Sequence, residues 1–459
     1  MFARTMIAGL LAGSITLTTQ AADWPQFRGP NGSGVSTEKE LPSEWSSEQN
    51  LKWKTPIPGV GWSAPIVVGD KIFVTTAVTD KQNKPKPGGG FGSGGTKGGG
   101  FKGGPGGGFG GKRAAPMVTY KFEVLCLDRN TGKQLWSQTA LEGKPTIPTH
   151  GSNTYATETP VTDGKNVFAY FGMHGLYCYD LDGELVWKKD LGTFPMVAGW
   201  GTASSPVLDG DRLFIQCDNE EKSFLIALDK TTGKELWKEA RGERSSWATP
   251  LVWKNKDRTE IVASGRKVRS YDPVTGKQLW ELNIGGQASS SPVGTNEFLY
   301  VGSGQGRGGN ESGGGALFAV KAGASGDVTP ENGKTSSAGV AWVQSRGGPE
   351  MASPLAYQDC VYIFARNGGL VSCYEAKTGT PAYTKERITG ARAFWSSPWA
   401  HDGKIYCVDE DGQTFVLQAG AEFKLLGKNS LKEMFWSTPA IAGNAILLRG
   451  VDNLYCIRK

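Results

Sequence analysis

Tryptophans that recur at one position of an internal repeat are the strongest candidates for chemistry in this sequence. Four stand three residues before a proline and a fifth lies near the same position; the set is Trp62, Trp200, Trp247, Trp395 and Trp436. Arg244 and Arg392 each precede one of these tryptophans by three residues. Indole rings stack on planar, sugar or peptide groups, and a guanidinium pairs with anions. The pattern predicts an aromatic, cationic ligand site at a channel mouth, with packing between repeats as the alternative that spacing alone leaves open.

Residues for other kinds of chemistry are scattered along the chain. The three histidines, His150, His174 and His401, show no metal-ligand spacing. No two cysteines are adjacent, and neither a Cys-x-x-Cys pair nor a serine nucleophile elbow is present. The sequence therefore predicts no metal site and assigns no catalytic residue.

A repeated hairpin supplies the elements that must position these side chains. The phrase Leu228-Asp-Lys-Thr-Thr-Gly-Lys-Glu-Leu-Trp237 recurs closely at 127–136 and 271–280 and loosely at 182–187 and 377–383. In each copy an aromatic residue follows the glycine by four positions, and these residues are Trp136, Trp187, Trp237, Trp280 and Tyr383. The aspartate accepts hydrogen bonds in the turn and the glycine provides a positive φ. The five aromatic residues are predicted to dock structurally, each closing a hairpin.

Eight Ser/Thr-Pro units separate these hairpins, each followed by short apolar runs. Most of the proline-to-proline gaps are 41 to 46 residues, and the two longer gaps each contain a Gly-rich insertion. Four short strands at this period indicate a β-propeller blade. We therefore predict an all-β, eight-bladed propeller of four-stranded antiparallel blades. Residues 51–54 are expected to pair with the last blade and close the ring.

The segments outside the repeats set the predicted domain organisation. Residues 1–21 resemble a cleaved signal peptide, with Arg4 before an apolar run and small residues at the predicted cleavage site. Residues 22–50 are expected to form an arm on a propeller of residues 51–459. Gly-rich segments at about 80–115 and 302–315 interrupt two blades, and the first is expected to be disordered. Residues 80–113 carry seven basic residues and one acidic residue, a net charge equal to the formal +6 of the whole chain, so the charge does not indicate nucleic-acid binding by the ring.

The cysteines are expected to be core residues. Cys126, Cys178, Cys373 and Cys456 occupy the same repeat position, which places them in different blades. Equivalent positions of different blades lie too far apart for a disulfide, so buried thiols are the favoured interpretation.

The Asp-x-x-Thr-Gly-Lys-x-Leu-Trp hairpins and Ser-Pro strands together resemble the pyrroloquinoline-quinone (PQQ)-type repeat. This repeat occurs in quinoprotein alcohol dehydrogenases, in the assembly lipoprotein BamB and in exported propellers of no assigned activity, and the resemblance covers the chain after about residue 50. It implies the fold, whereas the function must come from the site.

The resemblance also implies what a catalytic member would contain. Such enzymes pair PQQ with Ca²⁺ held by carboxylate and amide oxygens, and they place two adjacent cysteines over the cofactor. This sequence has no adjacent cysteines and no residues that match the calcium ligands. We therefore expect no cofactor and a non-catalytic, exported, soluble and monomeric propeller. It would bind an unknown protein partner or a small ligand at one face in the periplasm or outside the cell. A PQQ- and calcium-dependent oxidoreductase is the alternative.

Overall fold

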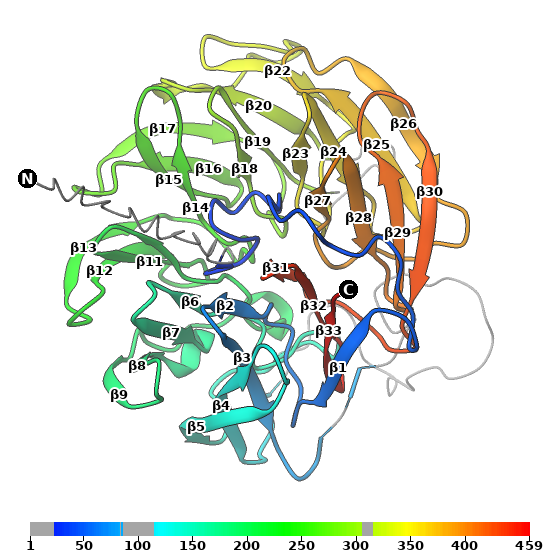
Figure 1. Ribbon diagram of the computed structural model, residues 1–459. Helices are drawn as coiled ribbons and strands as arrows, with labels where there is room; N and C mark the ends of the chain where they lie inside the picture. Colours follow the sequence, from blue (N-terminus) through cyan, green and yellow to red (C-terminus); the bar gives the residue numbers. More distant parts are fainter. Residues whose placement is uncertain (1–22, 83, 86–113, 305–314) are drawn as a thin grey trace, which may run out of the picture.

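The computed structural model describes residues 23–82, 84–85, 114–304 and 315–459. The predicted signal peptide and the central parts of both Gly-rich segments lie outside these residues. The described chain forms a ring of eight sheets around a central axis (Figure 1). The blades are numbered here in chain order.

Each blade is an antiparallel sheet that runs from an innermost strand at the axis to an outermost strand at the perimeter. Blades 1 to 4 contain β2 (Ile66–Val68), β3 (Lys71–Val78), β4 (Tyr120–Asp128) and β5 (Gln134–Gly143); β6 (Val161–Thr162), β7 (Asn166–Tyr170), β8 (Leu176–Asp180) and β9 (Leu185–Lys189); β10 (Val207–Asp209), β11 (Arg212–Cys217), β12 (Phe224–Asp229) and β13 (Glu235–Ala240); β14 (Leu251–Lys254), β15 (Thr259–Ala263), β16 (Lys267–Tyr271) and β17 (Gln278–Asn283).

Blades 5 to 8 repeat the pattern with two variations. They contain β18 (Val293–Gly294), β19 (Phe298–Gly302), β20 (Leu317–Lys321) and β22 (Val340–Gln344); β23 (Leu355–Tyr357), β24 (Cys360–Phe364), β25 (Leu370–Glu375) and β26 (Pro381–Arg387); β27 (Trp399–His401), β28 (Lys404–Val408), β29 (Gln413–Gln418) and β30 (Leu425–Ser430); β31 (Ala440–Ala442), β32 (Ala445–Arg449) and β33 (Asn453–Ile457). The short β21 (Gly326–Asp327) adds a parallel fifth strand to blade 4, which the repeat did not predict.

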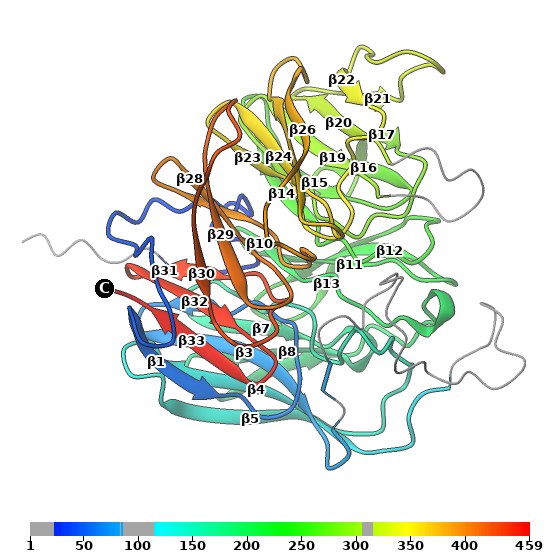
Figure 2. The ribbon, with the colours of Figure 1, turned by 90° about the vertical axis from the view of Figure 1, so that its right-hand side faces the viewer.

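The ring closes between the two ends of the chain, as predicted. β1 (Leu51–Pro56) pairs antiparallel with β33 and supplies the fourth strand of blade 8. Figures 1 and 2 both show these strands side by side. The pairing completes the last blade with a strand from the other end of the chain and so holds the ring closed.

The repeated hairpin has the turn chemistry that its sequence indicates. In blade 3, Asp229 Oδ1 accepts hydrogen bonds from the amides of Thr231 (3.1 Å) and Thr232 (2.8 Å). Gly233 has a φ of +68°, which an L-residue adopts at a cost. The carboxylate and the glycine together fix the reversal between the third and fourth strands.

The hairpin aromatic residues dock on a neighbouring blade rather than closing their own hairpin. Trp187 Nε1 donates to the carbonyl of Lys230 (3.0 Å), and its ring lies over Gly233, where a Cβ would come within 2.7 Å. Trp136 and Trp237 make the same contact with the hairpins of blades 2 and 4. Each of these glycines therefore allows its own turn to form and leaves room for the tryptophan ring of the preceding blade.

Two of the five aromatic residues lie differently. Trp280 is fully buried and donates to Glu260 Oε2 (2.6 Å) within its own blade. Tyr383 packs against Phe423 with ring centroids 5.6 Å apart. Phe423 lies in the hairpin between β29 and β30, so Tyr383 also contacts the next blade, although its partner is a side chain. At the junction of blades 4 and 5 the contact comes from Trp253 instead, whose Nε1 donates to the carbonyl of Thr295 (2.7 Å).

Residues 23–50, called the N-terminal arm below, cross the centre of the ring as the dark blue segment in Figure 1. Trp24 is buried and bridges to Val67 of β2. Further along the arm, Val35 bridges to Ala400 of β27 in blade 7. The arm thus ties together innermost strands of blades that lie far apart in the sequence.

All seven cysteines are buried free thiols, which confirms their interpretation as core residues. Within the described ranges the only helical segments are two single 3₁₀ turns, Gly172–His174 and Val197–Gly199. Neither is long enough or apolar enough to cross a membrane.

Candidate functional site

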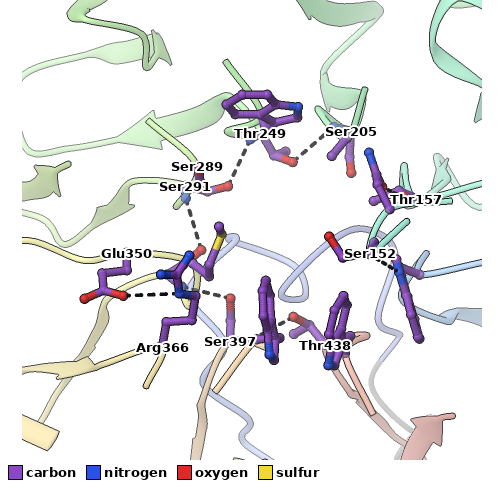
Figure 3. Close-up of a pocket in the computed structure, with 18 of the residues that line it drawn as sticks. Ser152, Thr157, Ser205, Thr249, Ser289, Ser291, Glu350, Arg366, Ser397 and Thr438 are labelled. Carbon is purple, nitrogen blue, oxygen red and sulfur yellow. Dashed lines mark hydrogen bonds and ion pairs between the residues drawn. The ribbon is translucent and has the colours of Figure 1, made fainter. Parts of the chain in front are cut away.

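The central channel contains a cavity of about 590 Å³ (Figure 3). Its wall is built mainly from the segments that lead into the innermost strands, together with Phe27 of the N-terminal arm. All five predicted mouth tryptophans line it: Trp62, Trp200, Trp247, Trp395 and Trp436. The repeat position thus brings five side chains from distant parts of the sequence to one cavity.

Three of these tryptophans form a continuous column in the wall. The centroids of Trp395 and Trp436 are 4.1 Å apart with ring planes at 19°, and Trp62 packs on Trp436 at 5.2 Å. The guanidinium of Arg366 lies 5.9 Å from the centroid of Trp395, within cation–π distance. Because the rings stack on one another, the column packs neighbouring blades and lines the cavity at the same time. The two interpretations of the sequence pattern therefore both describe this column.

A second aromatic group lies in blades 2 to 4. Trp200 and Trp247 are 5.5 Å apart, and the ring of His150 meets Trp200 edge-on at 6.2 Å. Trp247 Nε1 donates to the carbonyl of Gly201 (2.8 Å), which fixes the orientation of its ring. Neither pair of indoles is left to rotate freely, so the aromatic wall is preorganised.

The cation that lines the cavity is Arg366, and the two predicted arginines are not among the lining residues. Arg244 is exposed, with its Nε 3.9 Å from Glu220. Arg392 bonds to Asp411 (3.2 Å). Both guanidiniums thus have carboxylate partners outside the wall of the cavity. Sequence reasoning missed Arg366 because it follows the second strand of its blade instead of preceding a tryptophan.

Arg366 has a carboxylate near it in the wall. Its Nε lies 3.7 Å from Glu350 Oε2, and both side chains are partly exposed to the cavity (Figure 3). Glu350 is the only carboxylate among the described residues that line the cavity.

The hydroxyl groups of the Ser/Thr-Pro units form a ring around the channel. In six of these residues the amide donates to the side-chain oxygen of the equivalent residue in the next blade, over 2.9 to 3.1 Å. The ring consists of Thr159, Ser205, Thr249, Ser291, Ser353, Ser397 and Thr438, all of which line the cavity. Figure 3 labels Ser205, Thr249, Ser291, Ser397 and Thr438. At the eighth position stands Ala64, whose amide donates to Thr159 Oγ1 (2.9 Å) but whose side chain cannot accept. The sequence marks these residues as the starts of strands and gives no sign of their mutual bonding.

Two fully buried arginines lie directly behind this ring. Arg28 of the arm donates from Nη2 to the carbonyls of Pro354 (2.5 Å) and Ser33 (3.0 Å), and its Nε and Nη1 have no partner among the described residues. Arg449 donates from Nη1 to the carbonyl of Ser63 (3.1 Å) and to its hydroxyl. Burial lowers the pKa of each guanidinium to about 9, so both stay charged at neutral pH.

A buried carboxyl group lies between two residues of the wall, Thr157 and Thr159. Glu158 is 1% exposed, and its Oε1 has no partner among the described residues. Burial raises the pKa of Glu158 to about 7, well above its ordinary value of 4.5. At neutral pH this group is therefore only partly ionised.

Comparisons with known proteins agree with this architecture. The sequence matches the family described as outer membrane protein assembly factor BamB over residues 93–220, 120–323 and 176–420. No curated protein sequence matches it significantly.

Among solved structures, the fold is similar to that of BamB from Moraxella catarrhalis, with 15% identity, a TM-score of 0.52, and coverage of 73% of this chain and 88% of that one. A europium-containing methanol dehydrogenase gives 11% identity, a TM-score of 0.57, and coverage of 94% and 90%. The quinohemoprotein alcohol dehydrogenase from Comamonas testosteroni gives 9% identity, a TM-score of 0.53, and coverage of 95% and 80%. At these identities the likeness concerns the fold alone.

Proposed function

This chain belongs to the PQQ-repeat family of the outer membrane protein assembly factor BamB, and on that premise we propose that it is a non-catalytic binding propeller whose site is the channel cavity. One observation carries the proposal: five tryptophans and Arg366 surround a cavity of about 590 Å³. This volume falls within the range of small-molecule sites, and such sites combine aromatic walls with a few polar groups.

The preorganised wall supports binding in particular. Trp395 lies between Trp436 and Arg366, and Trp247 is fixed by its hydrogen bond to Gly201. A site whose side chains are already ordered loses little conformational entropy when a ligand enters.

The residues of the cavity do not fit PQQ with calcium. Calcium takes six to eight oxygen ligands, several of them carboxylates. The lining residues that the structure describes offer one carboxylate, Glu350, which already faces Arg366, and no cysteine. Within the described ranges no group of three or more His, Cys, Asp and Glu residues could hold a metal ion. This donor set supports the non-catalytic binding role over the alternative, a PQQ- and calcium-dependent oxidoreductase.

Export is part of the proposal. The apolar run from Met6 to Leu17 and the small residues that follow it support cleavage after Ala21. Amino-terminal sequencing of the protein purified from its own cells should begin at Ala22. An intact amino terminus in the cytoplasmic fraction would contradict export.

Calorimetric titration tests the binding role directly. Mature protein would be titrated with a panel of sugars, short peptides, aromatic acids and PQQ with Ca²⁺, beside a Trp247→Ala/Trp395→Ala variant. Arg244→Gln is the matched control, because that side chain is exposed and does not line the cavity. We expect one ligand class to bind wild type and the control but not the tryptophan variant. Binding that survives in the tryptophan variant, or no binding by any class, would refute the proposal.

A further inference from the structure

The hydroxyl ring is the feature of the cavity that this binding role does not yet explain. Each of its seven hydroxyls uses a lone pair to accept the amide of the neighbouring blade. For none of the seven O–H groups do the described residues provide an acceptor, and all seven line the cavity. Accepting an N–H polarises a hydroxyl and strengthens it as a donor. The ring therefore presents a band of hydrogen-bond donors to whatever occupies the channel.

Two buried, positively charged guanidiniums, those of Arg28 and Arg449, lie in the wall next to these hydroxyls. Arg28 is 1% exposed and contacts the carbonyl of Pro354, the residue after the ring hydroxyl Ser353. Arg449 is 2% exposed and contacts Ser63, which lies between the lining residue Trp62 and the open ring position Ala64. Among the described residues neither guanidinium has a carboxylate within ion-pair distance. An unpaired charge in a low-dielectric interior projects its field much further than one in water.

The nearby carboxylates do not cancel this charge. Glu350 is opposed by Arg366 in the wall. Glu158 is only partly ionised at neutral pH, since burial raises its pKa to about 7. The unpaired Nε and Nη1 of Arg28 add further donor capacity that no described residue satisfies. Donors and uncompensated positive charge thus coincide at one level of the channel.

We propose that the hydroxyl ring binds an oxyanion, the carboxylate or phosphate group of the ligand that the cavity takes. The inference rests on the proposed binding function and names the chemical class of its ligand. Two or three adjacent hydroxyls donate to the anion, and Arg28 and Arg449 stabilise its charge through the wall. The aromatic column then contacts the remainder of the ligand, so the cavity selects organic anions over neutral molecules of the same size.

Calorimetry at constant ionic strength tests the proposal with three probes: inorganic phosphate, citrate and neutral glucose. The variants are Ser291→Ala/Ser353→Ala, which removes two adjacent ring hydroxyls, and Arg28→Gln, which removes the charge but keeps the ring. Arg244→Gln is the control for a change of net charge. We expect phosphate or citrate to bind wild type, and each variant to weaken that binding about 10-fold or more, as for loss of a charged hydrogen bond. The control should stay within about 2-fold.

The three probes distinguish failure of the anion proposal from failure of the proposed binding function. Glucose binding without anion binding would overturn the anion proposal and leave the binding role standing, whereas no binding of any ligand would overturn both. Preference for phosphate or for citrate tells which oxyanion the ring seats. If Arg28→Gln does not fold, the serine variant and Thr249→Val, which keeps the shape of the side chain, decide the question. Anion binding that is unchanged in the folded variants would also overturn it.

Discussion

Completing the hydroxyl ring by Ala64→Ser should stabilise the propeller. Seven of the eight junctions carry an amide-to-hydroxyl bond of 2.9 to 3.1 Å, and the eighth lacks one because Ala64 offers no hydroxyl to the amide of Thr438. Ala64 is 1% exposed, so the new oxygen would be buried as in the other blades. A neutral buried hydrogen bond contributes about 0.5–1.5 kcal/mol net. We expect the free energy of unfolding to rise by about 1 kcal/mol.

Urea unfolding followed by tryptophan fluorescence would measure this change. The slope of the unfolding free energy against urea concentration should be the same in wild type and variant, so that a shift of the midpoint reports stability. The reverse experiment is Ser397→Ala, which leaves the buried amide of Ser353 without its acceptor. It should cost about 1–3 kcal/mol, because an unsatisfied buried donor costs more than a hydrogen bond contributes. Suppose that Ser397→Ala destabilises as expected but Ala64→Ser has no effect or destabilises. The amide of Thr438 at the junction of blades 8 and 1 then does not lack an acceptor. The reasoning about the eighth position would then be wrong.

Three further changes test other parts of the fold. Gly233→Ala should cost about 1–3 kcal/mol more than Gly210→Ala in urea unfolding, because both glycines have positive φ but only the first would place a Cβ against a tryptophan ring, at 2.7 Å. Burial raises the folded-state pKa of Glu158 to about 7 from 4.5, so its contribution to stability is complete below about pH 4.5 and is lost as pH rises through 7. Glu158→Gln should remove that pH dependence, on the order of 3 kcal/mol, and a variant with an unchanged pH profile would contradict the assignment. Arg241→Met should lower the free energy of unfolding by about 3–5 kcal/mol, because it leaves the fully buried carboxylate of Asp218 without its cationic partner. Adding Asp218→Asn should recover part of this loss in the same assay.

The fold was predictable because each blade repeats the same local signals. Turn aspartates, turn glycines and Ser/Thr-Pro units act over a few residues, so a single copy such as 228–237 already specifies a hairpin. The count of eight followed from the prolines, and ring closure followed from the spare strand at residues 51–54. The tryptophans of the cavity were also found, since their repeat position fixes where their backbone lies.

The polar parts of the site were not predictable in the same way. The direction of a long charged side chain depends on where its partner lies. Arg244 pairs with Glu220, and Arg392 pairs with Asp411. Both carboxylates are on neighbouring loops, whose positions depend on the whole ring. Arg28 is a further case, because its residue type and its Gly-rich surroundings suggest a surface position. Its burial depends on Pro354, more than 300 residues away in the sequence. Such contacts belong to the tertiary structure and leave no local periodicity.

The pairing of β1 with β33 also has a consequence for how the chain is made. The two strands of this pair are about 400 residues apart, so the ring cannot close while the chain is still being synthesised and closure must follow the last strand. Until then β1 lacks the strand with which it pairs, whereas Pro354 and Ala400, which the arm contacts, precede β33 in the chain and are available earlier. Loss of β33 would leave β1 without the strand with which it pairs and would open the ring between blades 8 and 1.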